Sequence, residues 1–279
     1  MPPIKELHYF DRDRSYPSPS HLASDSILER FTSQERHNRR FRKKFVFEMA
    51  KSIVRLSPSE FAWKSRYFLE SCSIEWYESL FAAGGSKLKG EITPAYAILS
   101  REDVALISEV FSSLKILFLI RNPIHRAWSH VRYDYTNGKI SNLRDFQEVK
   151  NLIDSPFQER RSDYLRTYDV WTSYFGRENV LVRFYEQIKE EPHDLLSDVG
   201  SFLGLSNVSS LYRPKKSQQK VNTSTKAEIP ENVKLYLSRM YYDELLQMCD
   251  VFGGYASGWV EEAEATIKQH QHQLPLRQS

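Results

Sequence analysis

The chain has 279 residues, of which 41% are hydrophobic and 13% aromatic, a composition that is typical of globular proteins and excludes a disordered chain. The formal net charge of +3 is mild, so it agrees with an anionic ligand without requiring one. The two cysteines, Cys72 and Cys249, lie far apart and lack metal-ligand spacing, which fits a reducing compartment.

The first part of the chain is expected to be helical after one short strand. The expected elements are a strand over 4–10, a loop over 12–24, and helices over 26–33, 34–55, 58–62 and 66–82. Six cations lie between Arg36 and Lys44. A solvated helix face explains such a run most simply, and a groove for a sulfated or carboxylated glycan is the alternative. Nucleic acid fits less well, because no recognised binding fold surrounds the run.

The most informative segment combines a strand, a turn and a helix. Ile116 to Ile120 form an apolar run that is typical of a strand buried in a parallel sheet. Asn122 is a good N-cap and a proline follows it, so a helix begins directly after the turn. Arg121 then lies at the carboxyl end of the strand, where open α/β sheets bind ligands. Ser129 lies seven residues past the cap, on the same helix face. A guanidinium, a hydroxyl and the positive end of a helix suit a phosphate.

Helices and strands alternate along the rest of the chain. We expect strands over 115–121 and 179–184, and helices over 101–112, 123–137, 142–153, 160–175, 192–203 and 231–250. Residues 206–228 are expected to form a loop, and the charged, glutamine-rich residues after Val260 are expected to fray. Strands separated by helices predict an α/β fold of three layers, with a parallel sheet flanked by helices. We expect one domain over residues 1–260 and a polar C-terminal tail over 261–279.

Several motifs resemble those of the sulfotransferases that use 3′-phosphoadenosine 5′-phosphosulfate (PAPS). The run from Arg121 to His130 resembles the family's 3′-phosphate element, an Arg-Asn-Pro…Arg-Ala…Ser-His pattern. The run from Lys5 to Asp11 resembles its Lys-Glu-x-His-Phe-Phe-Asp segment, and the run that starts at Gly90 resembles its Gly-Glu-Lys-Thr-Pro-x-Tyr turn. Other similar segments follow in the family's order at 75–81, 163–175, 179–186 and 202–205. The likeness covers most of residues 1–255 and is closest to the bacterial and heparan-sulfate-sulfotransferase-like branch.

The resemblance implies a P-loop-like sulfotransferase fold, PAPS as co-substrate and no metal. It implies that Arg121 and Ser129 bind the 3′-phosphate and that Glu6 is the general base. On strand alternation Glu6 and His8 share one face, so they would point together as a catalytic pair. The alternative for Glu6 is an exposed carboxylate at the end of the chain.

The resemblance implies further binding residues. A basic loop over 215–224 would close over the nucleotide, with Lys216, Lys220 and Asn222 as its contacts. A flexible surface loop with adventitious lysines explains this segment equally well. Lys5 and Tyr164 are the residues expected to contact the substrate.

The sequence departs from the family's pattern at two places. Family members begin with a strand and a Lys-x-Gly-Thr-Thr loop that holds the 5′-phosphosulfate, but Lys5 is already the fifth residue here. We therefore expect the first strand and this loop to be missing, through a truncated or misassigned start or in a genuine short form. An opened sheet predicts poor solubility or dependence on a partner. Ile92 takes the place of the lysine in the family's Gly-Glu-Lys-Thr-Pro turn, which argues against a specific assignment of heparan sulfate as acceptor.

Three functions remain open from the sequence. The first is a PAPS-dependent sulfotransferase that acts on a hydroxyl or amine of a glycan or small metabolite. The second is a non-catalytic homologue that binds adenosine 3′,5′-bisphosphate or an acidic glycan. The third is a P-loop-like kinase, which the missing Walker loop argues against. The expected partners are the nucleotide and the acceptor, without nucleic acid. The sequence has no apolar run long enough to span a membrane and no signal peptide, so we expect a cytoplasmic protein.

Overall fold

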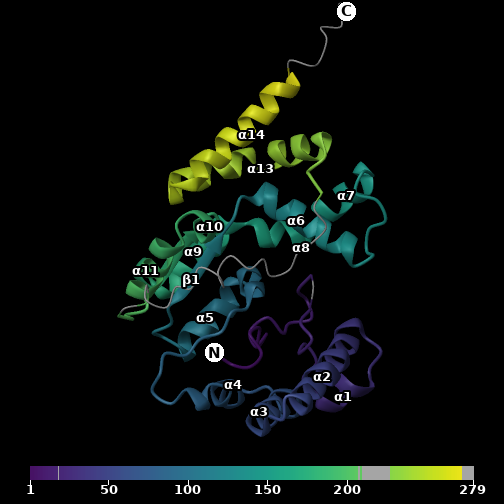
Figure 1. Cartoon of the computed structure of the whole chain (residues 1–279), viewed down its shortest axis with the longest axis vertical. Helices are drawn as coiled ribbons and strands as arrows, with labels where there is room; N and C mark the ends of the chain where they lie inside the picture. Colours follow the sequence, from purple (N-terminus) through teal and green to yellow (C-terminus); the bar gives the residue numbers. More distant parts are fainter. Residues whose placement is uncertain (18, 207, 209–226, 272–279) are drawn as a thin grey trace, which may run out of the picture. The chain divides into compact units, whose positions relative to one another are not determined.

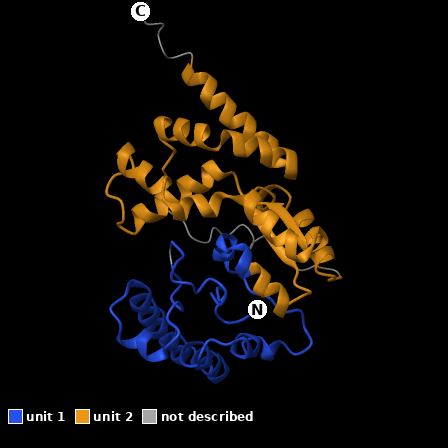
Figure 2. Cartoon of the chain, turned by 180° about the vertical axis from the view of Figure 1, so that it is seen from behind, with its two compact units in different colours: residues 1–103 blue, residues 104–279 orange. Residues whose placement is uncertain are grey.

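The computed structural model describes residues 1–17, 19–206, 208 and 227–271 (Figure 1). The chain divides into two units, residues 1–103 and residues 104–279 (Figure 2). Each unit encloses a hydrophobic core of its own. Within the described residues, no helix is long and apolar enough to cross a membrane.

The first unit is built mainly from helices that pack on an aromatic core. They are α1 (Ile27–Thr32), α2 (Arg36–Val54), α3 (Pro58–Leu69) and α4 (Ile74–Ser79), followed by the short 3-10 helices η1 (Ala82–Gly84) and η2 (Pro94–Ile98). Serine side chains cap α1, α3 and α4 by accepting a backbone N–H at each helix start. The capping serine Ser73 explains why the expected helix over 66–82 is broken: α3 ends at Leu69 and a new helix begins after the cap.

A buried lysine ties α2 to α3. The ammonium group of Lys64 is fully buried, and it lies 2.7 Å from a carboxylate oxygen of Glu48 on α2 and 2.7 Å from one of Glu60 on its own helix. Aromatic rings fill the space beside this ion pair, with Trp63 stacked on Tyr67 at 5.6 Å between ring centroids. Two carboxylates face the one ammonium, so removing Lys64 would leave both without their cation, whereas removing one carboxylate would leave Lys64 paired with the other.

The strand that we expected over residues 4–10 is wrong. His8 has φ of +56°, in the left-handed region that strands do not use. The backbone N–H groups of Leu7 and Tyr9, which a strand would give to a neighbouring strand, instead donate to side chains of residues 91–96. The segment is therefore an irregular loop pinned to a second loop.

The second unit is an α/β structure, which confirms the expected fold class. In its described part, strands β1 (Ile116–Ile120) and β2 (Val180–Phe184) pair in parallel, with Ile116 opposite Val180 and Ile120 opposite Phe184. The helices of the second unit are α6 (Pro123–Thr136), α7 (Phe146–Ile153), α8 (Pro156–Ser162), α9 (Tyr164–Phe175), α10 (Gln187–Glu190), α11 (Pro192–Phe202), α13 (Glu231–Phe252) and α14 (Tyr255–Gln271), with the 3-10 helix η3 at Arg177–Asn179. Helix α5 (Arg101–Val110) crosses the boundary between the units.

The C-terminal residues differ most from the expectation. The residues after Val260 were expected to fray, but α14 continues to Gln271. The helix is held because Trp259, Ala263 and Thr266 are buried along one face, at spacings of four and three residues. Tertiary burial thus outweighs the polar composition of this segment.

Candidate functional site

The turn after β1 places a cation at the carboxyl ends of the two strands. Asn122 caps α6 by accepting the backbone N–H of Ile124 at 2.9 Å, as the sequence predicts. The guanidinium of Arg121 lies over the ring of Tyr185, 4.8 Å from its centroid. The backbone N–H of Tyr185 donates to Ile120 at 2.8 Å, so the stacked pair directly continues the strand pair. The sequence prediction missed Tyr185, although its position after the second apolar strand is a usable signal.

Ser129 lies on the second turn of α6, about 10 Å along the axis from the N-cap. It is half-buried, as is Arg121. Both residues therefore belong to one strand–turn–helix element, and the helix start lies between them in the sequence. A cation, a hydroxyl and a helix N-terminus are the groups that bind phosphate in proteins.

A carboxylate from α14 braces this turn. Glu262 accepts hydrogen bonds from Asn122 Nδ2 at 3.2 Å and from His125 Nε2 at 3.1 Å, and it lies 3.2 Å from Lys234 Nζ. The hydrogen bond from His125 has the largest effect on the pKa of Glu262, and together with the Lys234 ammonium it lowers that pKa to about 2 despite burial. Sequence reasoning missed Glu262 because its segment was expected to fray.

The remaining predicted residues of this unit have different outcomes. Tyr164 is only 4% exposed and packs edge-to-face on Phe118 at 5.7 Å, and burial raises its pKa to about 12. The side chain of Tyr164 is therefore part of the core, and its assignment to substrate binding stays a prediction. Lys216, Lys220 and Asn222 lie outside the described residues.

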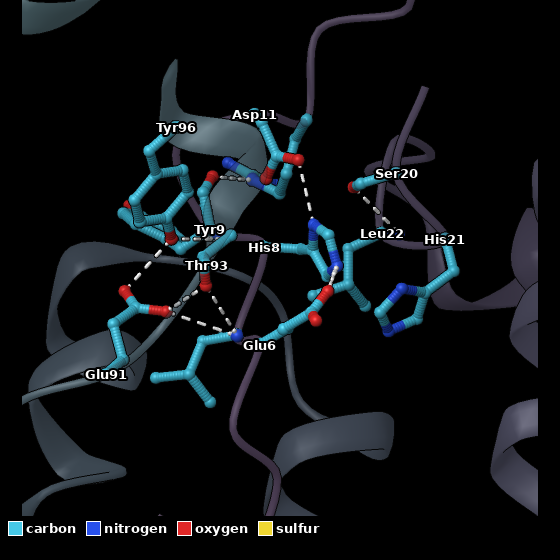
Figure 3. Close-up of polar contacts among 12 residues, drawn as sticks. Glu6, His8, Tyr9, Asp11, Ser20, His21, Leu22, Glu91, Thr93 and Tyr96 are labelled. Atoms are coloured by element: carbon cyan, nitrogen blue, oxygen red, sulfur yellow. Dashed lines mark hydrogen bonds and ion pairs between the residues drawn. The ribbon is translucent and has the colours of Figure 1, made fainter. Parts of the chain in front are cut away.

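In the first unit, His8 lies between two carboxylates (Figure 3). Its Nδ1 is 2.8 Å from Oδ2 of Asp11, and its Nε2 is 3.2 Å from Oε2 of Glu6. Both ring nitrogens face acceptors, so both must donate, which requires the imidazolium form. Burial opposes this charge, but the hydrogen bonds to Asp11 and Glu6 outweigh burial and raise the pKa of His8 to about 9.

The side chains of Glu6 and His8 are in contact, as the sequence analysis predicted, but the backbone conformation that brings them together differs from the predicted strand. The left-handed conformation of His8, not strand alternation, turns its ring back onto Glu6. Asp11 ends the Lys5 to Asp11 run, and the sequence does not indicate its role. It is 3% exposed and fixes the ring from the side opposite Glu6.

A polar clamp holds the backbone on both sides of the histidine. Glu91 accepts the N–H of Leu7 at 3.1 Å and the hydroxyl of Tyr96 at 3.0 Å. The Tyr96 oxygen in turn accepts the N–H of Tyr9 at 3.1 Å, and Thr93 Oγ1 accepts the N–H of Leu7 at 3.2 Å. The turn that starts at Gly90 therefore fixes the strained histidine in place, a role that its sequence alone does not reveal.

A second histidine packs against the first. The ring of His21 meets that of His8 edge-on at 5.3 Å, and its Nε2 is 3.0 Å from the hydroxyl of Tyr67. That hydroxyl donates to the carbonyl of Leu7 at 3.1 Å, so Nε2 of His21 is the donor to Tyr67. Burial lowers the pKa of His21 well below its usual value, with the charges of Lys44 and His8 acting in the same direction.

Lys44 brings one more cation to this cluster. Its Nζ lies 5.9 Å from the ring centroid of Tyr67, on the inner side of α2. Burial lowers the pKa of Lys44 to about 8, and the charge of Glu6 opposes this shift. The half-exposed Glu6 carboxylate therefore lies in cationic surroundings, while Lys5 beside it is exposed. A carboxylate held in this way can accept a proton from a bound hydroxyl or amine.

The chain matches a known protein family and is similar to two curated proteins. The sulfotransferase domain family matches residues 98–241, which include β1, Arg121, Ser129 and β2. The heparan sulfate glucosamine 3-O-sulfotransferases 3B1 and 3A1 of Mus musculus are each 27% identical over 146 residues. That match covers 48% of this chain and 36% of each relative, so the chain matches about a third of their length.

A solved structure supports the fold over nearly the whole chain. The sulfotransferase from Alicyclobacillus acidocaldarius superposes with a TM-score of 0.54, covering 92% of this chain and 87% of that one. Its sequence is 17% identical, so this similarity concerns the fold alone. Because the family match takes in half of the chain and the strand–turn–helix element at its centre, the chain belongs to the sulfotransferase domain family.

Proposed function

We propose that the chain transfers a sulfuryl group from PAPS to a hydroxyl or amine of a glycan or small metabolite. The observation that carries the proposal is the element formed by β1, Arg121 and α6, because it lies inside the family match and offers groups that bind phosphate. PAPS would supply the activated sulfuryl group, and its adenosine 3′,5′-bisphosphate part would be the leaving group.

In this proposal the second unit holds the nucleotide. Arg121 would make paired hydrogen bonds to the 3′-phosphate, and Ser129 would donate its hydroxyl to the same group. The ring of Tyr185 supports the guanidinium from one side, which restricts the rotamers of Arg121 before the ligand arrives. The brace from Glu262 keeps the N-cap, and so the start of α6, in position.

Glu6 would act as the general base in the first unit. A bond forms between the acceptor oxygen or nitrogen and sulfur, the bond from sulfur to the nucleotide phosphate breaks, and the acceptor's proton moves to Glu6. His8 is a positioning residue, since Asp11 fixes its ring and its Nε2 donates to Glu6.

The surroundings of Glu6 favour an acceptor that itself carries an anionic group. His8 is charged at neutral pH, and Lys44, whose pKa is about 8, is mostly charged there. An acidic sugar satisfies this condition, and the names of the two curated relatives refer to a sulfated glycan. We therefore include acidic glycans as the first acceptors to try.

The test is a transfer assay with sulfur-labelled PAPS and three acceptors: a sulfated glycan, its desulfated form and a simple phenol. We expect transfer to the acidic glycan, and a fall of at least about 100-fold in kcat for Glu6→Gln with the nucleotide affinity unchanged. Glu78→Gln, an exposed carboxylate on α4, is the matched control and should retain full activity. Tight binding of adenosine 3′,5′-bisphosphate without transfer to any acceptor would instead show a non-catalytic homologue.

A further inference from the structure

Helix α2, labelled in Figure 1, has one exposed face, which is basic in its first half and apolar in its second. The opposite face, with His37, Asn38 and Phe41, is buried in the first unit. Spacings of three and four residues place the exposed side chains in a single stripe. The stripe consists of Arg36, Arg39, Arg40 and Lys43 in the first half and Val46, Phe47, Ile53 and Val54 in the second.

The second half of this stripe exposes more apolar surface than any other described stretch of similar length. Eight large apolar side chains in the described part of the chain are more than 60% exposed, and five of them lie between Val46 and Leu56. Val54 is 82% exposed and Leu56, just past the helix, is 86% exposed. A concentration of this kind marks an interaction surface, whereas single exposed apolar residues do not.

The conformation of Leu56 gives an independent observation. Its φ is +49°, in the left-handed region, at a helix end where glycine or asparagine is usual. Backbone hydrogen bonds from Leu56 N–H to Ile53 and from Ser57 N–H to Ser52 hold this cap, and its side chain is left almost fully exposed. The helix cap thus presents Leu56 to solvent beside Val54 and extends the apolar half of the stripe by one residue.

The first half of the stripe identifies the chemistry of that partner. No acidic residue occurs between Arg36 and Phe47, so every ionic side chain in the first half of the stripe is a cation. An acidic glycan would satisfy these cations but would give Phe47 and Leu56 nothing apolar to contact. A second copy of the chain would bring another basic stripe and would not neutralise the first.

A bilayer with anionic headgroups satisfies both halves, since headgroups bind cations and the acyl region accepts apolar side chains. We propose that the exposed stripe of α2, together with Leu56, docks the protein onto an anionic membrane surface. The helix lies on the surface and does not span it, because its opposite face belongs to the core of the first unit.

The test is co-sedimentation of the full chain with two kinds of vesicle. One is phosphatidylcholine alone, which is neutral, and the other contains about 30 mol% phosphatidylserine as the anionic lipid. We expect binding to the anionic vesicles that weakens as salt is added, and much weaker binding to the neutral ones. Vesicle binding is measured without nucleotide or acceptor. A failure to bind vesicles would therefore not contradict the proposed sulfuryl transfer.

Two paired variants separate the halves of the stripe. Arg39→Gln with Lys43→Gln should weaken binding to anionic vesicles about 25-fold, since each cation near such a surface strengthens binding about fivefold. The control pair, Lys87→Gln with Lys89→Gln, removes two exposed cations elsewhere in the first unit and should leave binding unchanged.

Val54→Ser with Leu56→Asn should weaken vesicle binding at least about tenfold. Asparagine tolerates the left-handed conformation, so this variant should melt no lower than the native chain. Leu106→Ser, at a residue 61% exposed on α5, is the apolar control. The proposal would be overturned if the basic or the apolar double variant bound anionic vesicles as tightly as the native chain. It would also be overturned if the native chain bound soluble heparin but not anionic vesicles.

Discussion

The charge of His8 is the clearest consequence of structure at the scale of single residues. Its pKa is raised from 6.5 to about 9, so the stabilisation from its two carboxylate contacts is complete below pH 6.5 and is lost as pH rises through 9. We expect the free energy of unfolding to fall by on the order of 2 kcal/mol between these limits. Urea unfolding at a series of pH values measures this fall.

The variant His8→Asn isolates the effect. Asparagine accepts the left-handed backbone, so the loop keeps its shape while the titrating group is removed. The fall in stability towards pH 9 should then disappear, whereas His193→Asn, at an exposed histidine, should leave it intact. An unchanged pH profile in His8→Asn would show that another group is responsible.

Lys44 leads to a second prediction at this scale. Its replacement by methionine should raise the KM for an acidic acceptor about tenfold at pH 7, because one cation near Glu6 is lost. The difference between native and Lys44→Met proteins should shrink above pH 8, where the native lysine loses its proton. Initial rates measured from pH 6.5 to about 9.5 test this, because that range spans the Lys44 pKa of about 8.

Lys87→Met, at an exposed lysine away from Glu6 in the sequence, should keep the native KM at every pH. A KM that does not change in Lys44→Met would remove this lysine from acceptor binding.

Sequence reasoning found the residues whose signal is local and missed those defined by distant contacts. Arg121 and Ser129 follow from a strand end and a helix register, which neighbouring residues determine. Glu91 acts on residues more than 80 positions away, so nothing near it in the sequence indicates that role. Asp11 is the intermediate case, because its spacing from His8 is local but its burial is not.

At the scale of elements, the contact between α14 and α6 supports the turn that we propose binds phosphate. Glu262→Gln should lower the melting temperature by about 2–4 °C, because it weakens the pairing with His125 and Lys234. Its pKa is depressed, so the stabilisation is present above the ordinary carboxyl pKa and is lost as pH falls towards about 2. Thermal unfolding followed by circular dichroism at pH 7 measures the shift.

The matched control is Glu264→Gln, two residues along the same helix, which pairs with Lys268 at the surface. Surface pairs of this kind contribute little, so the melting temperature should change by less than 1 °C, on the order of experimental error. Equal shifts in the two variants would show that Glu262 is no more than a surface carboxylate.

The elements themselves were predicted best where pattern and burial agree. β1, α6 and β2 lie within about one residue of the expected bounds, since apolar runs and capping residues define them locally. The loop over 4–10 was misassigned because side-chain acceptors from residues 91–96 replaced a strand partner. Helix α14 was missed because burial of Trp259 and Ala263, which depends on the fold, stabilises it.

At the scale of the whole molecule, the two units contain different proposed sites. The family match lies mostly in the second unit, where the strands and the proposed 3′-phosphate site are found. The first unit holds the proposed base, the clamp around it and the basic and apolar stripe of α2. Nucleotide binding can therefore be tested separately from proton transfer and from membrane docking.

The proposed function depends most directly on Arg121, which we propose binds the 3′-phosphate of the nucleotide. Calorimetric titration of adenosine 3′,5′-bisphosphate into the chain tests it directly, with Arg121→Ala as the variant and Arg144→Ala, at an exposed arginine, as the control. We expect micromolar binding by the native chain and the control, and an affinity about 100-fold lower in Arg121→Ala. Equally tight binding by Arg121→Ala, or no binding by the folded native chain, would contradict it.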